Sequence, residues 1–189
     1  MLDLDLLDER HVSIVKEAIT EDRIGFIVQS IHANDDPAQV LYGECLPYLI
    51  DKDGMEHADV VFVPALEALG EAPVLDRHML KLVMDALELN SLSVLGYSLS
   101  SHSVSDTGSW AHIRDQIAAR PELSSRLVLQ FTGIPAFADV ALAINSLSEA
   151  KDLGCRIAID DHRSWTGIIC ALTRKHRYST TCENGYIVM

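Results

Sequence analysis

Residues Cys155–Trp165 read CRIAIDDHRSW, a short apolar run that leads directly into two adjacent carboxylates. An uninterrupted apolar run such as Ile157–Ile159 is typical of a strand buried on both faces of a parallel sheet. In α/β folds, ligands and metals usually lie at the carboxyl ends of such strands, where Asp160 and Asp161 stand. Two adjacent negative charges are unfavourable unless a cation or several hydrogen-bond donors compensate them. The segment therefore predicts either a ligand or metal site, or a solvated turn in which Asp161 caps the next helix.

The chain before this strand alternates between strand-like and helix-like patterns. The clearest helix is residues 74–89, where apolar residues recur at the 3.6-residue spacing of one helix face. Residues 24–31 and 39–44 form two strands joined by so short a connection that they should pair antiparallel. The further expected strands are 91–100, 126–132 and 156–160, and the further expected helices lie in 9–20, 110–117 and 140–151. The order β-β-α-β-α-β-α-β predicts an α/β fold whose later strands form a parallel sheet with right-handed crossovers.

The tail, residues 166–189, departs from this alternation and is expected to hold one short helix and one short strand. A complete (β/α)8 barrel needs roughly 200 residues or more, and this 189-residue chain supplies about five barrel strands. We therefore expect an incomplete barrel within a single domain. Because an open barrel leaves an unpaired edge strand, residues 166–189 or a partner chain should cover that edge.

The composition is that of a globular protein with a surplus of acidic groups. With 28 acidic and 15 basic residues the net charge is −13, which argues against a nucleic-acid-binding surface, since such surfaces are usually basic. The four cysteines are widely spaced and form no CxxC pair, as expected for reduced thiols in the cytoplasm. The N-terminal MLDLDLLDER is too acidic for a secretory signal, and no apolar run approaches the ~18 residues of a membrane span. We expect a cytoplasmic protein with neither a nucleic-acid nor a membrane partner.

Polar side chains stand at the ends of the expected strands, at Glu44, Ser98, Gln130, Asp160 and Asp161. Because the carboxyl ends of parallel strands meet on one face of a barrel, these side chains are expected to share a site. Each one taken alone is equally compatible with a solvated strand end, so the prediction depends on their occurring together.

Six short segments follow one another along the chain: Gln29–Ile31, Gly43–Leu46, Phe62–Pro64 with Glu67 and Gly70, Tyr97–Ser100, Gln130–Gly133 and Gly154–Asp161. In their order and spacing they resemble the EAL domain of bacterial cyclic-di-GMP signalling. The resemblance covers about residues 20–167. The family has a modified (β/α)8, TIM-like barrel with its first two strands antiparallel, and it hydrolyses cyclic di-GMP to linear pGpG with Mg²⁺ or Mn²⁺. The resemblance implies an incomplete EAL-type barrel over residues 1–189, with a divergent tail at 168–189.

The resemblance implies three remaining metal ligands, Glu44, Asp160 and Asp161, which are also the remnant of the catalytic carboxylates. They would hold Mg²⁺ or Mn²⁺, if any metal binds, because both ions prefer oxygen ligands. His162 and Arg163 replace the Phe-Gly of the family's loop linked to dimerisation and activity.

Other positions of the family's site depart from its pattern. Ser98 replaces an Asn ligand, Gln130 replaces a Glu, Gly133 replaces a second acidic residue, and Tyr48 stands where a phosphate-binding Arg is expected. Gln29, Ser98 and Gln130 remain as candidate ligand-binding residues. Two-metal hydrolysis needs several carboxylates to hold cations ~4 Å apart, so these replacements predict the loss of turnover.

The leading hypothesis is a degenerate EAL-domain protein that is catalytically inactive and acts through contacts with a protein partner or a second copy of itself. One alternative is a weak Mg²⁺- or Mn²⁺-dependent phosphodiesterase that uses Glu44, Asp160 and Asp161. Another is a sensor that binds cyclic di-GMP without cleaving it, and a third is a truncated remnant with little function. Cyclic di-GMP carries two phosphates, and the local carboxylates repel them without a metal, so binding is expected to be weak or absent.

Overall fold

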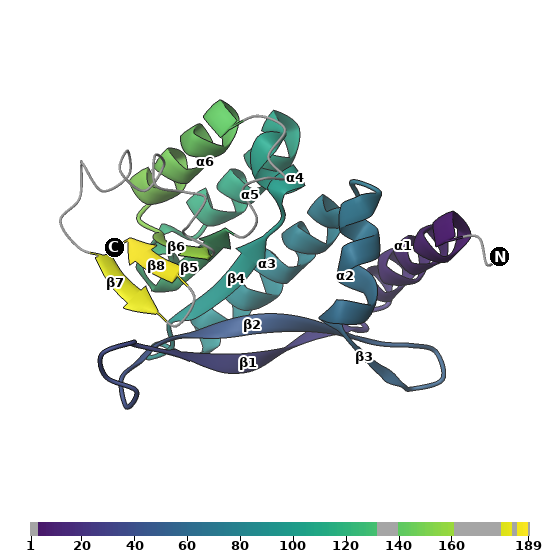
Figure 1. Cartoon of the computed structure of the whole chain (residues 1–189), viewed down its shortest axis with the longest axis horizontal. Coiled ribbons are helices and arrows are strands. Elements are labelled where there is room, and N and C mark those ends of the chain that lie inside the picture. The colour runs from purple at the N-terminus through teal and green to yellow at the C-terminus, as the bar shows by residue number, and fades with distance from the viewer. Residues whose placement is uncertain (1–3, 132–139, 161–178, 183–184, 189) are drawn as a thin grey trace.

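The computed structural model describes residues 4–131, 140–160, 179–182 and 185–188 of the chain (Figure 1). The described residues form eight strands, six α-helices and one 3-10 helix. They are α1 (Leu4–Thr20), β1 (Ile24–His32), β2 (Val40–Ile50), β3 (Glu56–Ala58), α2 (Asp59–Ala68), α3 (Ala72–Leu89), β4 (Leu95–Leu99), α4 (Ser101–Ser105), α5 (Thr107–Ala118), η1 (Pro121–Arg126), β5 (Leu127–Phe131), α6 (Val140–Asp152), β6 (Arg156–Asp160), β7 (Ser179–Cys182) and β8 (Gly185–Val188).

The strands form one sheet in the order β1-β2-β4-β5-β6-β8-β7, and β3 pairs with β2 beside this path. β1 and β2 are antiparallel, and β2, β4, β5 and β6 are mutually parallel. These pairings confirm the expected antiparallel hairpin followed by parallel β-α units. In Figure 1 the helices lie over one side of the sheet, as right-handed crossovers between parallel strands require.

The tail covers the edge that the parallel strands leave open. β8 pairs antiparallel with β6, from Ile157 opposite Val188 to Asp160 opposite Gly185, and β7 pairs antiparallel with β8. This confirms the expectation that part of residues 166–189 covers the edge of the sheet. The tail adds two strands where one was expected. β7 and β8 are antiparallel to each other because so short a connection allows only a hairpin. The short helix expected in the tail falls largely outside the described residues.

The long helix α3 forms as its apolar spacing predicts. Leu75, Met79, Val83 and Leu87 are buried and face the sheet, and Pro73 occupies the first turn, where its missing N–H leaves no hydrogen bond unmade. They belong to the main core, which lies between the helices and the sheet. This packing fixes the helix-covered face and leaves the opposite face of the sheet to carry the polar strand-end residues.

β2 is longer than expected, because it continues beyond Glu44 to Ile50. Its first part pairs with β4 at Gly43 and Glu44, and its last part pairs with β3 from Tyr48 onward. Pro47 lies between these two pairings. A residue without an N–H is tolerated there because neither of the described strands on that side needs its hydrogen bond.

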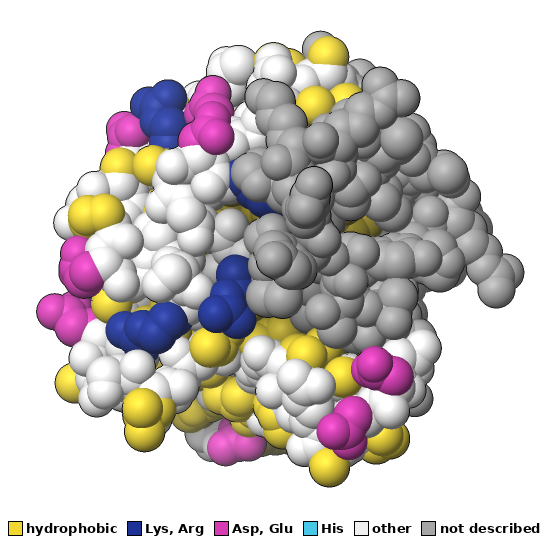
Figure 2. Space-filling model, turned by 90° about the vertical axis from the view of Figure 1, so that its left-hand side faces the viewer, with side chains coloured by type: hydrophobic (Ala, Val, Ile, Leu, Met, Phe, Trp, Pro, Cys, Tyr) yellow, Lys and Arg dark blue, Asp and Glu magenta, His cyan; other side chains and the backbone are white. Residues whose placement is uncertain are grey.

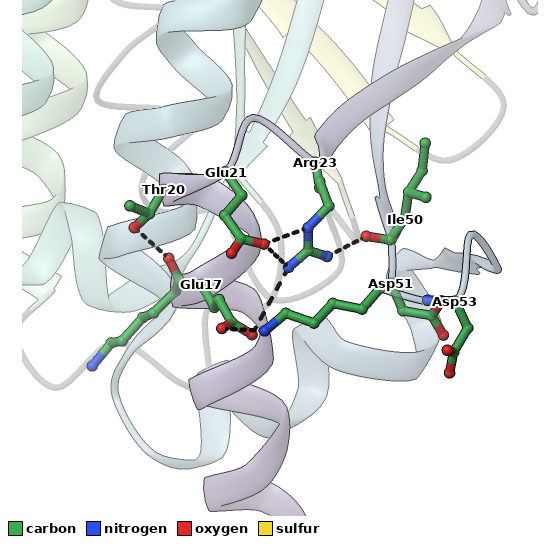
Figure 3. Close-up of polar contacts among 9 residues, drawn as sticks. Glu17, Thr20, Glu21, Arg23, Ile50, Asp51 and Asp53 are labelled. Carbon is green, nitrogen blue, oxygen red and sulfur yellow. Dashed lines mark hydrogen bonds and ion pairs between the residues drawn. The ribbon is translucent and has the colours of Figure 1, made fainter.

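A polar cluster ties the start of β1 to the end of β2 and to α1 (Figure 3). The Arg23 guanidinium donates to Glu21 at 2.8 Å and to the Ile50 carbonyl, while the Ile50 N–H donates to the Arg23 carbonyl at 2.9 Å. Lys52 forms an ion pair with Glu17 at 2.6 Å. These contacts set the register of the β1–β2 hairpin.

Candidate functional site

Strand register brings the predicted site residues onto the face of the sheet opposite the main core. Gln29 pairs with Glu44 across the hairpin, and Glu44 pairs with Gly96 in β4. Ser98, two residues further along β4, pairs with Gln130 in β5. Because side chains two residues apart lie on the same side of a strand, Gln29, Glu44, Ser98 and Gln130 share one face.

Asp160, a further predicted site residue, lies at the border of this face. Ala158 of β6 pairs with Gln130, and Asp160, two residues later, is the last residue of the strand. Its backbone position therefore falls at the carboxyl edge of the same face. Asp161, His162 and Arg163 lie outside the described residues.

Glu44 and Ser98 are in direct contact. The Ser98 hydroxyl donates to Glu44 Oε1 at 3.3 Å, and both residues are partly exposed. A hydroxyl is a weaker and shorter metal ligand than the amide oxygen of the Asn that the family places here. In this structure it serves as a hydrogen-bond donor to the remaining carboxylate.

Gln130 forms a buried hydrogen bond with Tyr42, a residue that the sequence reasoning missed. The Tyr42 hydroxyl donates to Gln130 Oε1 at 2.9 Å, and the two side chains are 3% and 8% exposed. Tyr42 and Gln130 are 88 residues apart, and Tyr42 lies on the same face of β2 as Glu44 because it precedes Glu44 by two residues. That alternation along β2 could have placed Tyr42 on the site face, but it does not indicate the hydrogen bond with Gln130.

Gly96 makes room for the Tyr42 ring. A Cβ atom at Gly96 would lie 2.6 Å from Tyr42 Cε2 and 3.2 Å from the Cβ of Val128. Tyr42, Val128 and Ala158 form a second, smaller apolar cluster on this face. The aromatic ring and the apolar cluster thus fill the part of the face beside Gln130.

The oxygen atoms of the site can be compared with the ligands that Mg²⁺ or Mn²⁺, the ions implied by the family resemblance, require. Among the described side chains the site offers the Glu44 carboxylate, the Ser98 hydroxyl and the Gln130 amide oxygen, which already accepts from Tyr42. Over the part of the chain that the structure describes, no group of three or more His, Cys, Asp or Glu side chains could hold a metal ion. Hard divalent cations need several oxygen ligands with negative charge among them, so the described side chains by themselves do not fit a two-metal centre. The side chain of Asp160 and residue Asp161 lie outside this described set.

The thiol next to Glu44 is not a nucleophile. Cys45 points to the main core, where burial, and secondarily the Glu44 charge, raises the pKa of its thiol to about 12. Only a thiolate attacks or binds metals readily, so Cys45 is unreactive at neutral pH. Its part in the site is to pack β2 against the helices.

A buried carboxylate in α3 holds the end of β4 in place, and the sequence reasoning missed it too. Asp76 accepts hydrogen bonds from the Tyr97 hydroxyl at 2.9 Å, from the N–H and hydroxyl of Ser100 at 2.9 and 2.6 Å, and from the Ser103 hydroxyl at 2.6 Å. Burial raises the pKa of Asp76, and these hydrogen bonds partly oppose that shift. Because Tyr97 and Ser100 flank Ser98, Asp76 is a positioning residue for the site.

Comparison with known proteins identifies the family of this chain. The sequence profile of the EAL domain matches residues 13–167. The chain belongs to the EAL domain family. The matched range begins before residue 20, where the resemblance in the sequence begins, and both end at residue 167. No curated protein matches the chain.

Solved EAL-domain structures share the fold. The chain is similar to the S helix-GGDEF-EAL segment of Vibrio cholerae LapD bound to c-di-GMP, with 20% identity and a TM-score of 0.73 over 87% of this chain and 41% of that one. It is similar to the FimX EAL domain of Pseudomonas aeruginosa bound to c-di-GMP, with 21% identity and a TM-score of 0.68 over 86% of this chain and 66% of that one. For the Xanthomonas citri FimX EAL domain in complex with c-diGMP the identity is 19% and the TM-score 0.65, over 79% of this chain and 59% of that one. The chain thus spans 66% or less of each of these relatives.

Among the helices that the structure describes, none is long and apolar enough to cross a lipid bilayer.

Proposed function

We propose that this EAL domain does not turn over cyclic di-GMP and acts through protein contacts. The observation that carries the proposal is the hydrogen bond from Tyr42 to Gln130 Oε1 at 2.9 Å. At the position where the family resemblance implies a metal-binding Glu, the chain has a neutral amide whose oxygen is buried and already paired. This arrangement supports a site that is stable without a cation.

The electrostatics of the site favour the same function. Glu44 supplies the charge among the described strand-end side chains, and Ser98 and Gln130 add none. Tyr48 stands on the same side of β2 as Glu44 and is uncharged, where a cationic residue would attract a phosphate. Among the described strand-end side chains, a ligand with two phosphates meets a carboxylate without an opposing positive charge, which disfavours both its binding and the stabilisation of a phosphoryl transition state.

Metal titration of matched variants tests this proposal. We expect the wild-type chain to bind Mn²⁺ no more tightly than millimolar, and we expect the double variant Ser98→Asn/Gln130→Glu to bind at least about tenfold more tightly, since affinity follows ligand charge. Glu44→Gln in the double variant should remove the gain. Calorimetry or Mn²⁺ electron paramagnetic resonance gives the constants. Micromolar Mn²⁺ binding by the wild type, lost in Glu44→Gln, would contradict the proposal.

A second candidate is a sensor that binds cyclic di-GMP without cleaving it. It is favoured by the c-di-GMP-bound LapD and FimX structures, whose fold this chain shares. Calorimetry with cyclic di-GMP, with and without Mg²⁺, separates the two. Submicromolar binding that disappears in Glu44→Ala would favour the sensor, and heats no larger than those of dilution would leave protein contacts as the function.

A further inference from the structure

β1 is the terminal strand of the sheet, and one of its edges is unpaired in the described part of the chain. β2 pairs with it over nine residue positions, and no described strand pairs with its other edge. In Figure 1 it lies along the lower margin of the sheet. An unpaired edge presents a row of N–H and C=O groups that can accept another strand.

The hydrogen-bond pattern shows which backbone groups point outward. The Ile50 N–H donates to the Arg23 carbonyl, so Arg23 and Ile50 form a hydrogen-bonded pair. Such pairs alternate along an antiparallel ladder, so residues 25, 27, 29 and 31 direct their N–H and C=O groups toward β2. Phe26, Val28 and Ser30 therefore direct theirs to the free edge.

The side chains of this edge are apolar, uncharged and accessible. Ile27 is 60% exposed on the site face, and Val28 is 54% exposed on the opposite face. The segment Ile24–Ile31, IGFIVQSI, contains no charged residue in a chain of net charge −13. Edge strands that stay single usually carry Lys, Pro or an inward charge, and β1 has none of these.

Charge repulsion between two copies is lowest along an uncharged strand. Figure 2 shows acidic, basic and hydrophobic side chains interspersed over one face of the molecule. Two copies that each carry −13 repel one another wherever acidic groups meet. An uncharged strand minimises this repulsion.

We propose that β1 pairs antiparallel with β1 of a second copy of this chain, about a two-fold axis through Val28. This register places Val28 opposite Val28 of the partner subunit and Phe26 opposite the partner's Ser30, so the outward N–H and C=O groups of all three residues are satisfied. It also places Ile27 beside the partner's Gln29, which covers the more exposed of the two apolar side chains. The two sheets then continue through the axis as one.

A second copy fits this edge better than an unrelated peptide, because the edge is complementary to itself. Under the two-fold axis every outward donor meets an outward acceptor of the same three residues, and side chains of one face meet side chains of the same face. The inference makes specific the protein contact in the proposed function. It does not depend on cyclic di-GMP or metal, so its test can fail while the loss of turnover stands.

Sedimentation velocity of the full chain across the micromolar range tests the pairing. We expect a dimer of twice 20.8 kDa for the wild type. Val28→Lys places two like charges opposite one another at the axis and should weaken the dimer by about tenfold or more. Val60→Lys is the matched control, because Val60 lies in α2, away from β1, and is 75% exposed. It should leave the dimer unchanged.

Cross-linking gives a second measurement that is independent of any effect of the lysine on folding. Opposed residues of a hydrogen-bonded antiparallel pair have Cα atoms ~5.5 Å apart, within the range of a disulfide. In a Cys45→Ala background, which removes the thiol opposite residue 28 within the same chain, Val28→Cys should therefore form a covalent dimer under mild oxidation, and Val60→Cys should not. A wild type that stays monomeric at all concentrations, or a dimer that Val28→Lys leaves intact, would overturn the proposal.

Discussion

The Tyr42–Gln130 hydrogen bond should make a measurable contribution to stability, because both partners are almost fully buried. Removing one partner leaves the other without its hydrogen bond in the core, which costs about 1–3 kcal/mol. Tyr42→Phe removes the donor that lies 2.9 Å from Gln130 Oε1 and preserves the ring over Gly96. Gln130→Met removes the acceptor at similar volume. We expect each single variant to lower the free energy of unfolding by ~1–2 kcal/mol.

The double variant Tyr42→Phe/Gln130→Met decides whether the two effects share one cause. Removing both polar partners at once leaves no unsatisfied group, so its cost should fall below the sum of the singles by roughly 1 kcal/mol. Urea denaturation followed by circular dichroism measures all four proteins. Tyr48→Phe is the matched control, since Tyr48 lies on the same strand and its hydroxyl makes no hydrogen bond with another described residue. Its effect should stay within about 0.5 kcal/mol. Additive single-variant costs, or costs no larger than that of the control, would refute the reasoning.

Three further predictions follow from the buried groups. Burial raises the pKa of Asp76 above its unfolded value, so the stability linked to its protonation is present below roughly pH 4 and is lost as pH rises through the folded pKa. The free energy of unfolding, measured in urea and plotted against pH, should therefore fall less steeply above roughly pH 4 in Asp76→Asn than in the wild type. An equal slope in the two proteins would contradict the raised pKa of Asp76. Gly96→Ala brings a Cβ to 2.6 Å from Tyr42 and should destabilise by about 1–3 kcal/mol, whereas a neutral effect in the same assay would show that the ring does not lie there. Burial raises the pKa of the Cys45 and Cys155 thiols to about 12, so a thiol reagent followed by peptide mass spectrometry should label both only on unfolding, and rapid native labelling would show that they are accessible.

Local patterns predicted most of the fold, because each depends on residues close in sequence. The apolar spacing of α3 and the uninterrupted run before Asp160 correspond to a long helix and to β6. The edge covered by β8 was expected because an open parallel sheet has an exposed strand that must be paired. The length of β2 was underestimated, because its second half, which contains Pro47, is held by pairing with the first half of β1, and β3 adds a partner only from Tyr48 onward.

The candidate site was predicted only in part, because its chemistry depends on register between distant strands. Glu44, Ser98 and Gln130 could be placed together from their strand-end positions, and the structure places them on one face. The hydrogen bond from Tyr42 to Gln130 joins residues 88 positions apart and requires the missing side chain of Gly96, which no local pattern indicates.

Asp76 shows a second limit of sequence reasoning. Within an amphipathic helix, an Asp next to an apolar stripe is ordinarily a solvated residue, and its burial follows from donors that β4 and α4 bring to it. Only the packing of these elements identifies it as a positioning residue.

A chromatographic assay for pGpG tests the central claim most directly. The wild-type chain, Glu44→Gln and Ser98→Asn/Gln130→Glu are each incubated with cyclic di-GMP and millimolar Mg²⁺ or Mn²⁺. We expect no pGpG above the rate without protein from the wild type or from Glu44→Gln, because Ser98 and Gln130 stand at two ligand positions of the family, where a hydroxyl and a hydrogen-bonded amide supply no negative charge to hold the cations that hydrolysis requires. Metal-dependent pGpG formation by the wild type that disappears in Glu44→Gln would contradict the account.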